Sequence, residues 1–425
     1  MSYSRPLEAS WPAGDVSSDP GNKYTVWLTL VTAVILGTMT FNFMLAFVNT
    51  NIMGIRDSHV MLSEMVLISV GLLLALDRRA SLYVVLTLYL SYMAFILSLR
   101  PELDLKAIRD ILIPLVFYSL GRKVERIEDA DRVVFLSAYL VLAVGLFEFL
   151  FLDLFTSFVN IFQYYVARGT LTADSNFVEG SNLFISSTRI GGRNFLPFLG
   201  NIRASSVFLE PVTMGNYGAF LCLWAFFRRD MAWRWLLFVL GFTVIILGDA
   251  RFGLFVTFAF FAVGLVHRAL PRAVLWLAPF LVALLLILYG GWTNQVHWED
   301  NLPGRVLSSA MIMAKLDWQA YLGIALDLPF VDDNGYAYSF SQIGVVGAAF
   351  LWALYIFASS HSEDAGKFKA LATVFICLLL VVSNSIYSIK LAALFWFCAG
   401  AADIARNDQS ESRAGITSQE RRASM

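Results

Sequence analysis

Residues 201–217 read NIRASSVFLEPVTMGNY, and this stretch joins a polar loop to an apolar run. Proline suits the first position of a helix, because its missing N–H would have no partner there. The residue before a proline is disfavoured in helical geometry. We therefore expect a helix that begins at Pro211, with Glu210 just outside it, where the helix dipole stabilises a carboxylate. Taken alone, the stretch fits equally well a glutamate cap and an arginine, Arg203, that extends its charge to a membrane surface.

The composition is that of a membrane protein. Hydrophobic residues make up 58% of the chain and charged residues 15%, whereas roughly 25% of residues are charged in ordinary soluble domains. The mean hydropathy is +0.67. All three cysteines fall inside apolar runs, so a disulfide framework is not expected. We predict an all-α polytopic membrane protein.

Apolar stretches of about 20 residues are long enough to span a bilayer. We predict twelve spans, near 25–47, 59–76, 80–98, 108–120, 133–152, 212–227, 235–248, 252–266, 273–290, 337–358, 369–384 and 388–404. Lys and Arg gather in the short loops on the side of the two chain ends, which marks that side as cytoplasmic. The expected organisation is a tail at 1–24, a transmembrane region at 25–404 and a tail at 405–425. Two long periplasmic segments, about 155–211 and 291–336, interrupt the transmembrane region.

Ionisable residues in or at the ends of the predicted spans gather in or at the outer half of the membrane. They are Glu64, Arg109, Asp110, Glu148, Glu210, Arg251 and Lys390. Such residues are costly in a membrane and tend to mark function. A transporter is expected to carry polar groups near the midplane, whereas an enzyme working at the outer surface would show this one-sided pattern. Tolerance of charge at helix ends explains Arg109 and Lys390 equally well, but explains Glu148 less well.

Three arginines are candidates for binding an anion outside the membrane. Arg203 precedes the span at 212–227, Arg251 lies in a tight turn between two spans, and Arg305 opens a predicted helix. Arginine is commoner on the cytoplasmic side, and guanidinium groups bind phosphate through paired hydrogen bonds. Their convergence would suit a lipid-linked pyrophosphate. Snorkelling to the membrane surface is the other interpretation, and for Arg305 the two are evenly balanced.

The residues Asp332, Asp333 and Asn334 precede the tenth predicted span. An aspartate at this place could accept a proton from a sugar hydroxyl. Asp-Asn-Gly is more commonly a turn or a helix cap. The four histidines are scattered and predict no metal site, and no glycine-rich phosphate loop is present.

Three motifs resemble those of bacterial Wzy-type polysaccharide polymerases and their relatives, the O-antigen ligases. IRASSVFLEPVTMGNY has the spacing R-x-x-x-x-F-x-E-P, and LGDARFGLF is similar to a second motif with an arginine at the start of a span. DNGYAYSFSQIGVVGAAFLW resembles the late motif, with Gly344 and Gly347 as its G-x-x-G. The likeness in topology extends over the whole chain, and in sequence it depends on these short stretches.

The resemblance implies a GT-C-like membrane glycosyltransferase that acts at the periplasmic face without a metal or nucleotide cofactor. Its substrate would be an undecaprenyl-pyrophosphate-linked oligosaccharide, bound by Arg203, Arg251 and, with a looser match, Arg305. Asn334 and Tyr336 of the late motif are further candidates for contacting substrate, and Asp333 and Glu210 are the candidate bases. Ligases of the family have a histidine where Asp333 stands, which disfavours a ligase.

The expected function is therefore polymerisation of exopolysaccharide or O-antigen repeat units at the bacterial inner membrane, with both termini cytoplasmic. A ligase is the first alternative, and a flippase or exporter of lipid-linked glycan without chemistry is the second. The expected partners are membrane lipid and a chain-length regulator and flippase of the same pathway. No nucleic-acid partner is expected.

Overall fold

The structure is a computed structural model that describes residues 20–77, 80–100, 106–175, 178, 180–189, 191–293, 301–325, 334–360 and 364–404. Within these ranges the regular structure is helical, and one isolated antiparallel bridge joins Thr188 to Ile202. The first eight α-helices are α1 (Pro20–Asn51), α2 (Asp57–Ala75), α3 (Ala80–Ser98), α4 (Lys106–Gly121), α5 (Ile127–Leu150), α6 (Leu152–Phe158), α7 (Ile161–Ala167) and α8 (Pro211–Phe227). The others are α9 (Arg234–Leu247), α10 (Arg251–Val266), α11 (Arg272–Trp292), α12 (Leu302–Lys315), α13 (Trp318–Leu322), α14 (Gly335–Ile356), α15 (Ala365–Val382) and α16 (Ile389–Ile404).

The described helices identify a multi-pass membrane protein. Eight of them are long and apolar enough to cross a membrane, namely α1, α2, α3, α5, α10, α11, α14 and α15. A helix lies at each of the twelve predicted spans. However, α4, α8, α9 and α16 have only 16, 17, 14 and 16 residues, fewer than the roughly 20 that a straight crossing needs. The described part of the chain thus supports eight spans by length and composition, and the prediction of twelve is not established.

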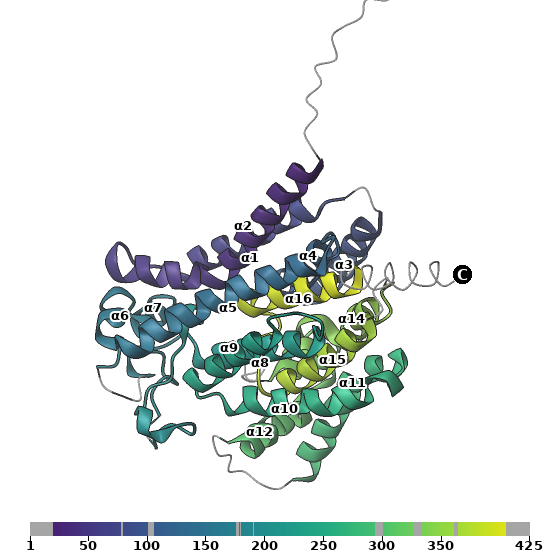
Figure 1. Ribbon diagram of the computed structural model, residues 1–425. Helices are drawn as coiled ribbons and strands as arrows, with labels where there is room; N and C mark the ends of the chain where they lie inside the picture. The colour runs from purple at the N-terminus through teal and green to yellow at the C-terminus, as the bar shows by residue number, and fades with distance from the viewer. Residues whose placement is uncertain are drawn as a thin grey trace, which may run out of the picture.

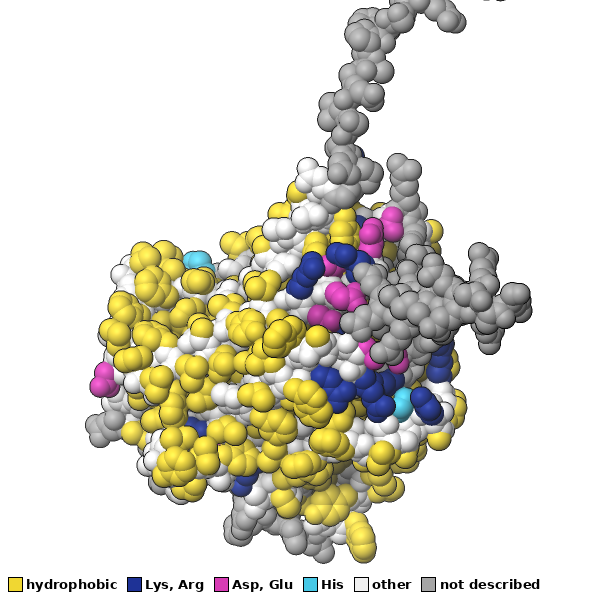
Figure 2. All heavy atoms as spheres, viewed as in Figure 1, with side chains coloured by type: hydrophobic (Ala, Val, Ile, Leu, Met, Phe, Trp, Pro, Cys, Tyr) yellow, Lys and Arg dark blue, Asp and Glu magenta, His cyan; other side chains and the backbone are white. Residues whose placement is uncertain are grey.

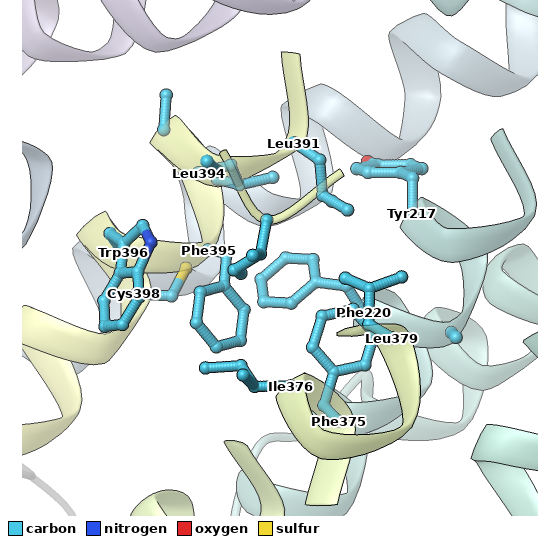
Figure 3. Packing of buried hydrophobic residues seen from close by; sticks show 14 of the residues in the cluster. Tyr217, Phe220, Phe375, Ile376, Leu379, Leu391, Leu394, Phe395, Trp396 and Cys398 are labelled. Carbon is cyan, nitrogen blue, oxygen red and sulfur yellow. The ribbon is translucent and has the colours of Figure 1, made fainter. Parts of the chain in front are cut away.

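Two of these short helices, α8 and α16, lie in the core beside α15. Figure 3 shows Phe220 of α8 beside Phe375 of α15 and Phe395 of α16. The Phe395 ring centroid lies 5.4 Å from that of Phe375 and 5.9 Å from that of Phe220. A helix that is apolar all round is expected to be buried. Burial inside the protein, and not contact with lipid, accounts for the hydropathy of α8 and α16.

Two glycines bring α4 and α16 into close contact. A Cβ atom on Gly400 would lie 2.1 Å from the Tyr118 carbonyl oxygen, and one on Gly121 would lie 1.9 Å from the Phe397 carbonyl oxygen. Small residues allow this approach of backbones between membrane helices. The crossing fixes α16 against α4 along its length.

The surface of the protein is largely apolar. In Figure 2 hydrophobic side chains cover most of the visible face, while charged side chains gather at the right, near the described ends of the chain. In Figure 1 the first turn of α1 and the end of α16 lie toward that same side, and α6 and α7 lie at the opposite end. An apolar belt with charge at one rim is the surface expected of a protein in a bilayer.

The two long segments predicted to be periplasmic each contain short helices. The first carries α6, α7 and three 3₁₀ turns, at Ala173–Ser175, Pro197–Leu199 and Ser206–Phe208. The second carries α12 and α13, and its residues 294–300 and 326–333 lie outside the described ranges. Arg305 lies in α12, so the helix predicted around it is confirmed.

Helix α14 is broken at Gly344, the first glycine of the G-x-x-G pair. Gly344 has φ 69° and ψ 159°, a conformation that glycine adopts without strain. The Arg100 guanidinium donates to the Ser341 and Gln342 carbonyl oxygens at 2.9 and 2.7 Å, and the Tyr92 hydroxyl donates to Ile343 O at 2.7 Å. Backbone groups freed inside a membrane need such partners. The break is therefore built into the fold.

Candidate functional site

Four arginines line one pocket of about 70 Å³. Arg203, Arg251 and Arg305 come from three separate segments of the chain, and Arg189 joins them. Among the described residues of its wall, Asp249 is the single acidic one. We call this the arginine pocket. Guanidinium groups form paired, charge-assisted hydrogen bonds with phosphate and carboxylate oxygens, so the arginine pocket is suited to an anion.

Two helices begin at the arginine pocket. Arg251 is the first residue of α10, and Ala250, which precedes it, also lines the pocket. Asn301 caps α12 by accepting a hydrogen bond from the Gly304 N–H at 2.8 Å, and it lines the pocket too. Helix N-termini carry partial positive charge and present N–H groups to anions. Both helix starts therefore add to the attraction for a negatively charged group.

The end of α9 holds Arg203 in place. The Arg203 Nε donates to Gly248 O at 2.9 Å and its Nη1 donates to Ser186 O at 3.0 Å, and the residue is only 4% exposed. Arg193 donates to the Ile246 carbonyl near the end of the same helix. The carbonyl end of a helix favours cations. Arg203 thus ties the loop before α8 to α9 while also forming part of the pocket wall.

Asp249 organises the loop that carries Arg189. It is fully buried and has a positive φ of 47°, which Asp and Asn tolerate better than most residues. Its carboxylate accepts hydrogen bonds from the Asn194 and Phe195 N–H groups, at 3.0 and 2.8 Å, and from Asn194 Nδ2 at 2.8 Å. Arg189 Nε lies 3.6 Å from Asp249 Oδ2. The carboxylate positions the loop by binding its backbone.

Glu148, the intramembrane carboxylate that the sequence left unexplained, fixes the turn before α8. It is fully buried in α5 and accepts the N–H groups of Ser205 and Ser206 at 2.8 and 2.6 Å. The Ser205 hydroxyl donates to its other oxygen at 2.8 Å. Ser206 has a positive φ of 53°, so the turn is held in an uncommon conformation. Glu148 therefore has a positioning role in the loop of Arg203.

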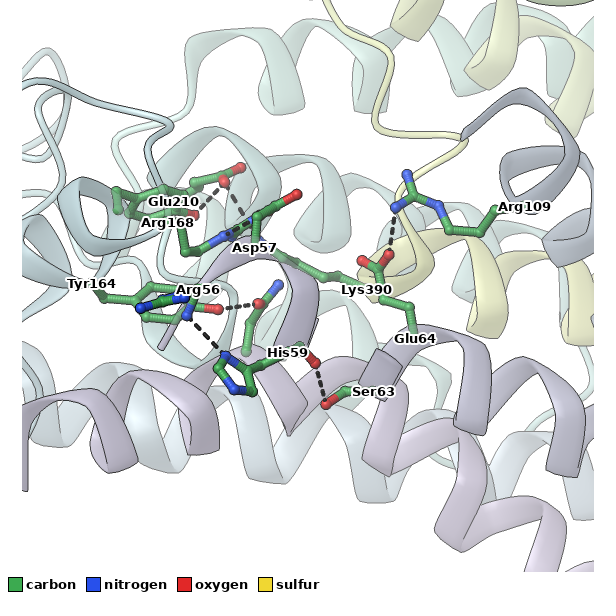
Figure 4. Close-up of polar contacts among 12 residues, drawn as sticks. Arg56, Asp57, His59, Ser63, Glu64, Arg109, Tyr164, Arg168, Glu210 and Lys390 are labelled. Carbon is green, nitrogen blue, oxygen red and sulfur yellow. Dashed lines mark hydrogen bonds and ion pairs between the residues drawn. The ribbon is translucent and has the colours of Figure 1, made fainter. Parts of the chain in front are cut away.

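Glu210 lies outside the first turn of α8, as predicted, with Pro211 inside it. Lys390 Nζ approaches Glu210 Oε1 to 3.3 Å, the Tyr165 hydroxyl donates to the same oxygen, and the Thr213 hydroxyl donates to Oε2 at 2.9 Å. Figure 4 shows Glu210 and Lys390 meeting from separate elements. The described lining of the arginine pocket includes Val212 from this region but not Glu210.

The environment of Glu210 favours its ionised form. Burial by itself raises the pKa of this carboxyl. The Lys390 charge and the Tyr165 and Thr213 hydroxyls outweigh that effect, so the pKa of Glu210 lies below its usual value. Burial and the neighbouring Glu210 charge raise the pKa of Tyr165 well above its usual value, which keeps Tyr165 a donor. Glu210 is thus a carboxylate at neutral pH, with weak basicity.

The described residues of the late motif do not line the arginine pocket. Asp333 and Asp332 lie outside the described residues. Asn334 is fully buried and caps α14, since its side chain accepts from Ala337 N at 3.0 Å and donates to Ser309 O at 2.9 Å. Tyr336 is also buried and donates to Cys377 O at 3.1 Å. Neither residue belongs to the described wall of the arginine pocket, and Tyr336 lines a separate apolar cavity, so their contact with substrate stays a prediction.

No protein-family model, no curated protein and no solved structure matches this chain. The geometry of the site is therefore the basis on which a function can be proposed.

The sequence interpretation missed Arg189, Asp249 and the partnership of Lys390 with Glu210. Arg189 has the same feature that singled out Arg203: it is an arginine in a long segment predicted to lie on the side away from the chain ends. Asp249 lies within the LGDARFGLF motif, two residues before Arg251, so the sequence could have indicated it as a residue of the same site. Lys390 is 180 residues from Glu210, so no local pattern could have joined them.

Proposed function

We propose that this chain polymerises lipid-linked oligosaccharide repeat units at the periplasmic face of the bacterial inner membrane. The observation that carries the proposal is the arginine pocket, in which Arg189, Arg203, Arg251 and Arg305 surround the starts of two helices. A pyrophosphate that joins a glycan to a polyprenyl chain has the negative charge and the several oxygens that such a set would bind.

In the proposed reaction the arginines hold the donor pyrophosphate. An acceptor hydroxyl oxygen attacks the anomeric carbon, and the bond from that carbon to the phosphate oxygen breaks. The hydroxyl proton passes to a general base, and the lipid pyrophosphate leaves with the bonding electron pair. Fixed positive groups aimed at the leaving oxygen stabilise the charge that develops on it. No metal or nucleotide is required by this scheme.

Asp333 is the first candidate for the base and Glu210 the second. The partners of Glu210 favour its ionised, weakly basic form, whereas an efficient base has a pKa near the working pH. A positioning role therefore suits Glu210 better. The proposal also includes the family resemblance of the motifs, twelve membrane spans, a GT-C-like fold and cytoplasmic termini. Reporter fusions at Gly169 and Arg126 test the orientation: the first should report the periplasm and the second the cytoplasm.

The deciding experiment is deletion of the gene in its natural host, followed by analysis of the lipid-linked glycans that accumulate. Single repeat units on lipid would support a polymerase. Long chains on lipid would indicate the alternative of a ligase. Accumulation of single units that stay on the cytoplasmic side would indicate a flippase or exporter. Normal polymer in the deletion strain would exclude all three.

A further inference from the structure

A second polar pocket lies beside α2, α4, α14 and the start of α16. It has a volume of about 130 Å³, and its lining includes Glu64, Lys106, Arg109, Asp110, Tyr338 and Tyr387. We call it the α2–α4 pocket. Its residues differ entirely from those of the arginine pocket.

The ionisable groups of the α2–α4 pocket form one network. Arg109 lies 2.7 Å from Glu64 Oε2 and 2.7 Å from Asp110 Oδ1 (Figure 4 shows the first pair), and the Tyr338 hydroxyl donates to Asp110 Oδ2. The Arg109, Glu64 and Asp110 side chains are 17%, 14% and 5% exposed. Lys106 Nζ lies 5.1 Å from the centre of the Tyr338 ring. Cations and carboxylates set side by side can bind both a phosphate and sugar hydroxyl groups.

A large apolar cavity adjoins this pocket. It has a volume of about 380 Å³, and α3, α4, α11, α14, α15 and α16 contribute to its wall. Leu115, Phe280, Ala348 and Leu351 are among its lining residues. Polar residues from the other end of the helices, Asp77, Arg122 and Lys123, border it as well. Pockets of this size and apolar character bind ligands with hydrocarbon portions.

Tyr387 lines both the α2–α4 pocket and the apolar cavity. The oxygen atoms of Tyr387 and Ser339 are hydrogen-bonded at 2.7 Å, and the Tyr387 ring lies 5.6 Å from that of Tyr338. The charged pocket and the apolar cavity thus meet at Tyr387. A ligand that fits both would have a small polar head directly attached to a long hydrocarbon chain.

The α15–α16 connection keeps this arrangement apart from the arginine pocket. Leu380 near the end of α15 borders the apolar cavity, whereas Val382, two residues later, borders the arginine pocket. Asn216 of the arginine pocket wall donates to the Ser385 hydroxyl at 3.4 Å, and Asn384 beside it lines the α2–α4 pocket. A group bound in one pocket would therefore lie across this connection from a group bound in the other.

We propose that the α2–α4 pocket and the apolar cavity together form a second lipid site, which takes a polyprenyl phosphate head in the pocket and its chain in the cavity. Naming this lipid as a polyprenyl phosphate that carries the acceptor sugar rests on the proposed function, whereas the polar pocket and the apolar cavity are observed independently of it. Lys106 and Arg109 bind the phosphate, and Glu64 and Asp110 bind hydroxyl groups of the first sugar. The chain runs along α14 from Ser339 toward Leu351 and Tyr355.

Photolabelling of the purified full-length protein in lipid nanodiscs tests this site. The probes are two short polyprenyl phosphates, one with a diazirine on the isoprene next to the phosphate and the other with a diazirine on the last isoprene. We expect the first to label the Ser339–Ile343 region of α14 and the second to label the Leu351–Tyr355 region, as mapped by mass spectrometry. The reverse order, or labelling confined to the exposed Val346 and Phe350, would overturn the proposal.

A matched pair of variants on the same helix tests occupancy. Ala348→Trp fills the cavity and should lower labelling of α14 at least tenfold, whereas Val346→Trp, at a position 66% exposed to the outside, should leave it unchanged. Equal labelling of the two variants would refute the site. If Ala348→Trp does not fold, the positions at which the two probes label α14 in the unsubstituted protein still decide whether the site exists.

An arginine-pocket variant separates the second lipid site from the proposed function. Arg251→Gln should keep the photolabel map while polymer is lost. A preserved map together with normal polymer in Arg251→Gln would refute the proposed function and leave the second lipid site standing.

Discussion

The Lys390 ammonium bridges the start of α16 to the entry of α8, because it lies 3.3 Å from Glu210 Oε1 and donates to Phe208 O at 3.1 Å. The Lys390 side chain is 8% exposed and that of Glu210 is 30% exposed. This pair holds the loop that contains the first arginine motif against the helix that forms the centre of the bundle.

Replacing Lys390 by Met should destabilise the protein, because the Glu210 carboxylate loses its charged partner. Breaking a fully buried pair costs ~3–5 kcal/mol, and water reaches Glu210, so we expect a loss of about 2 kcal/mol in unfolding free energy. Thermal unfolding in detergent measures it. The double variant with Glu210→Gln should recover part of the loss. If the loss in the double variant equals the sum of the losses in Lys390→Met and Glu210→Gln, the two side chains are not coupled.

The pKa of Glu210 predicts how this contribution depends on pH. The folded protein holds this pKa below the ordinary 4.5, so the unfolded chain takes up its proton first as the pH falls. The stability from Glu210 is complete above about pH 5 and is lost as the pH falls through the lowered pKa. Unfolding temperatures of the unsubstituted and Glu210→Gln proteins should therefore differ by a constant amount near neutrality and converge in acid. A difference that grows toward acid would contradict the direction of this pKa shift.

Much of this fold can be predicted from the sequence, because apolar runs separated by charged loops give the positions of twelve helices to within a few residues. Hydropathy could not tell lipid-facing helices from α8 and α16, because a core helix and a spanning helix are equally apolar. The arginines of the pocket were singled out one at a time by their unusual side of the membrane. Their convergence with Arg189, and the clamp of Glu148 on Ser205 and Ser206, depend on contacts between distant segments that no local pattern encodes.

The close crossing of α4 and α16 predicts a strong effect of a single methyl group. Gly400→Ala would place its Cβ 2.1 Å from Tyr118 O, so the helices must move apart, and we expect a loss of about 3 kcal/mol or more. Gly366→Ala in α15 is the matched control, because no atom lies within 4 Å of its added Cβ. That substitution should be neutral or slightly stabilising, by up to about 1 kcal/mol. Similar unfolding temperatures for the two variants would argue against the crossing.

The arginine pocket predicts that lysine cannot replace its arginines. A lysine keeps the charge but loses the paired hydrogen bonds, each worth about 1.5–3 kcal/mol to a charged group, so Arg251→Lys and Arg305→Lys should lower polymer about tenfold to a hundredfold. Their protein levels should stay normal. Arg203→Lys should reduce polymer and also stability, since Arg203 donates to Gly248 O and Ser186 O.

Arg132→Lys provides the control for the arginine variants. Its side chain is 67% exposed and pairs with Asp129 near the start of α5, far along the chain from the pocket, so polymer should be unchanged. Polymer can be followed by gel electrophoresis of the extracted glycan, and protein levels by immunoblotting. Normal polymer in both Arg251→Lys and Arg305→Lys would remove the basis for pyrophosphate binding.

The last prediction concerns the base, for which Asp333 is the first candidate. A base must be able to take up a proton, so Asp333→Asn should lower polymerisation by about a hundredfold or more. Asn and Asp cap helices about equally well, and Asn334 already caps α14 through its bond to Ala337 N. The substitution should therefore leave folding intact, which size-exclusion chromatography of the purified variant checks.

Two companion variants make the test of the base specific. Asp332→Asn removes a neighbouring carboxylate of the same kind and should retain polymer of near-normal length. Glu210→Gln should weaken the contact with Lys390 and lower stability, with a smaller effect on the chemical step, because Glu210 is a weak base in its present surroundings. If Glu210→Gln alone abolishes polymer while Asp333→Asn remains active, the base role passes to Glu210, and its pairing with Lys390 must open when substrate binds.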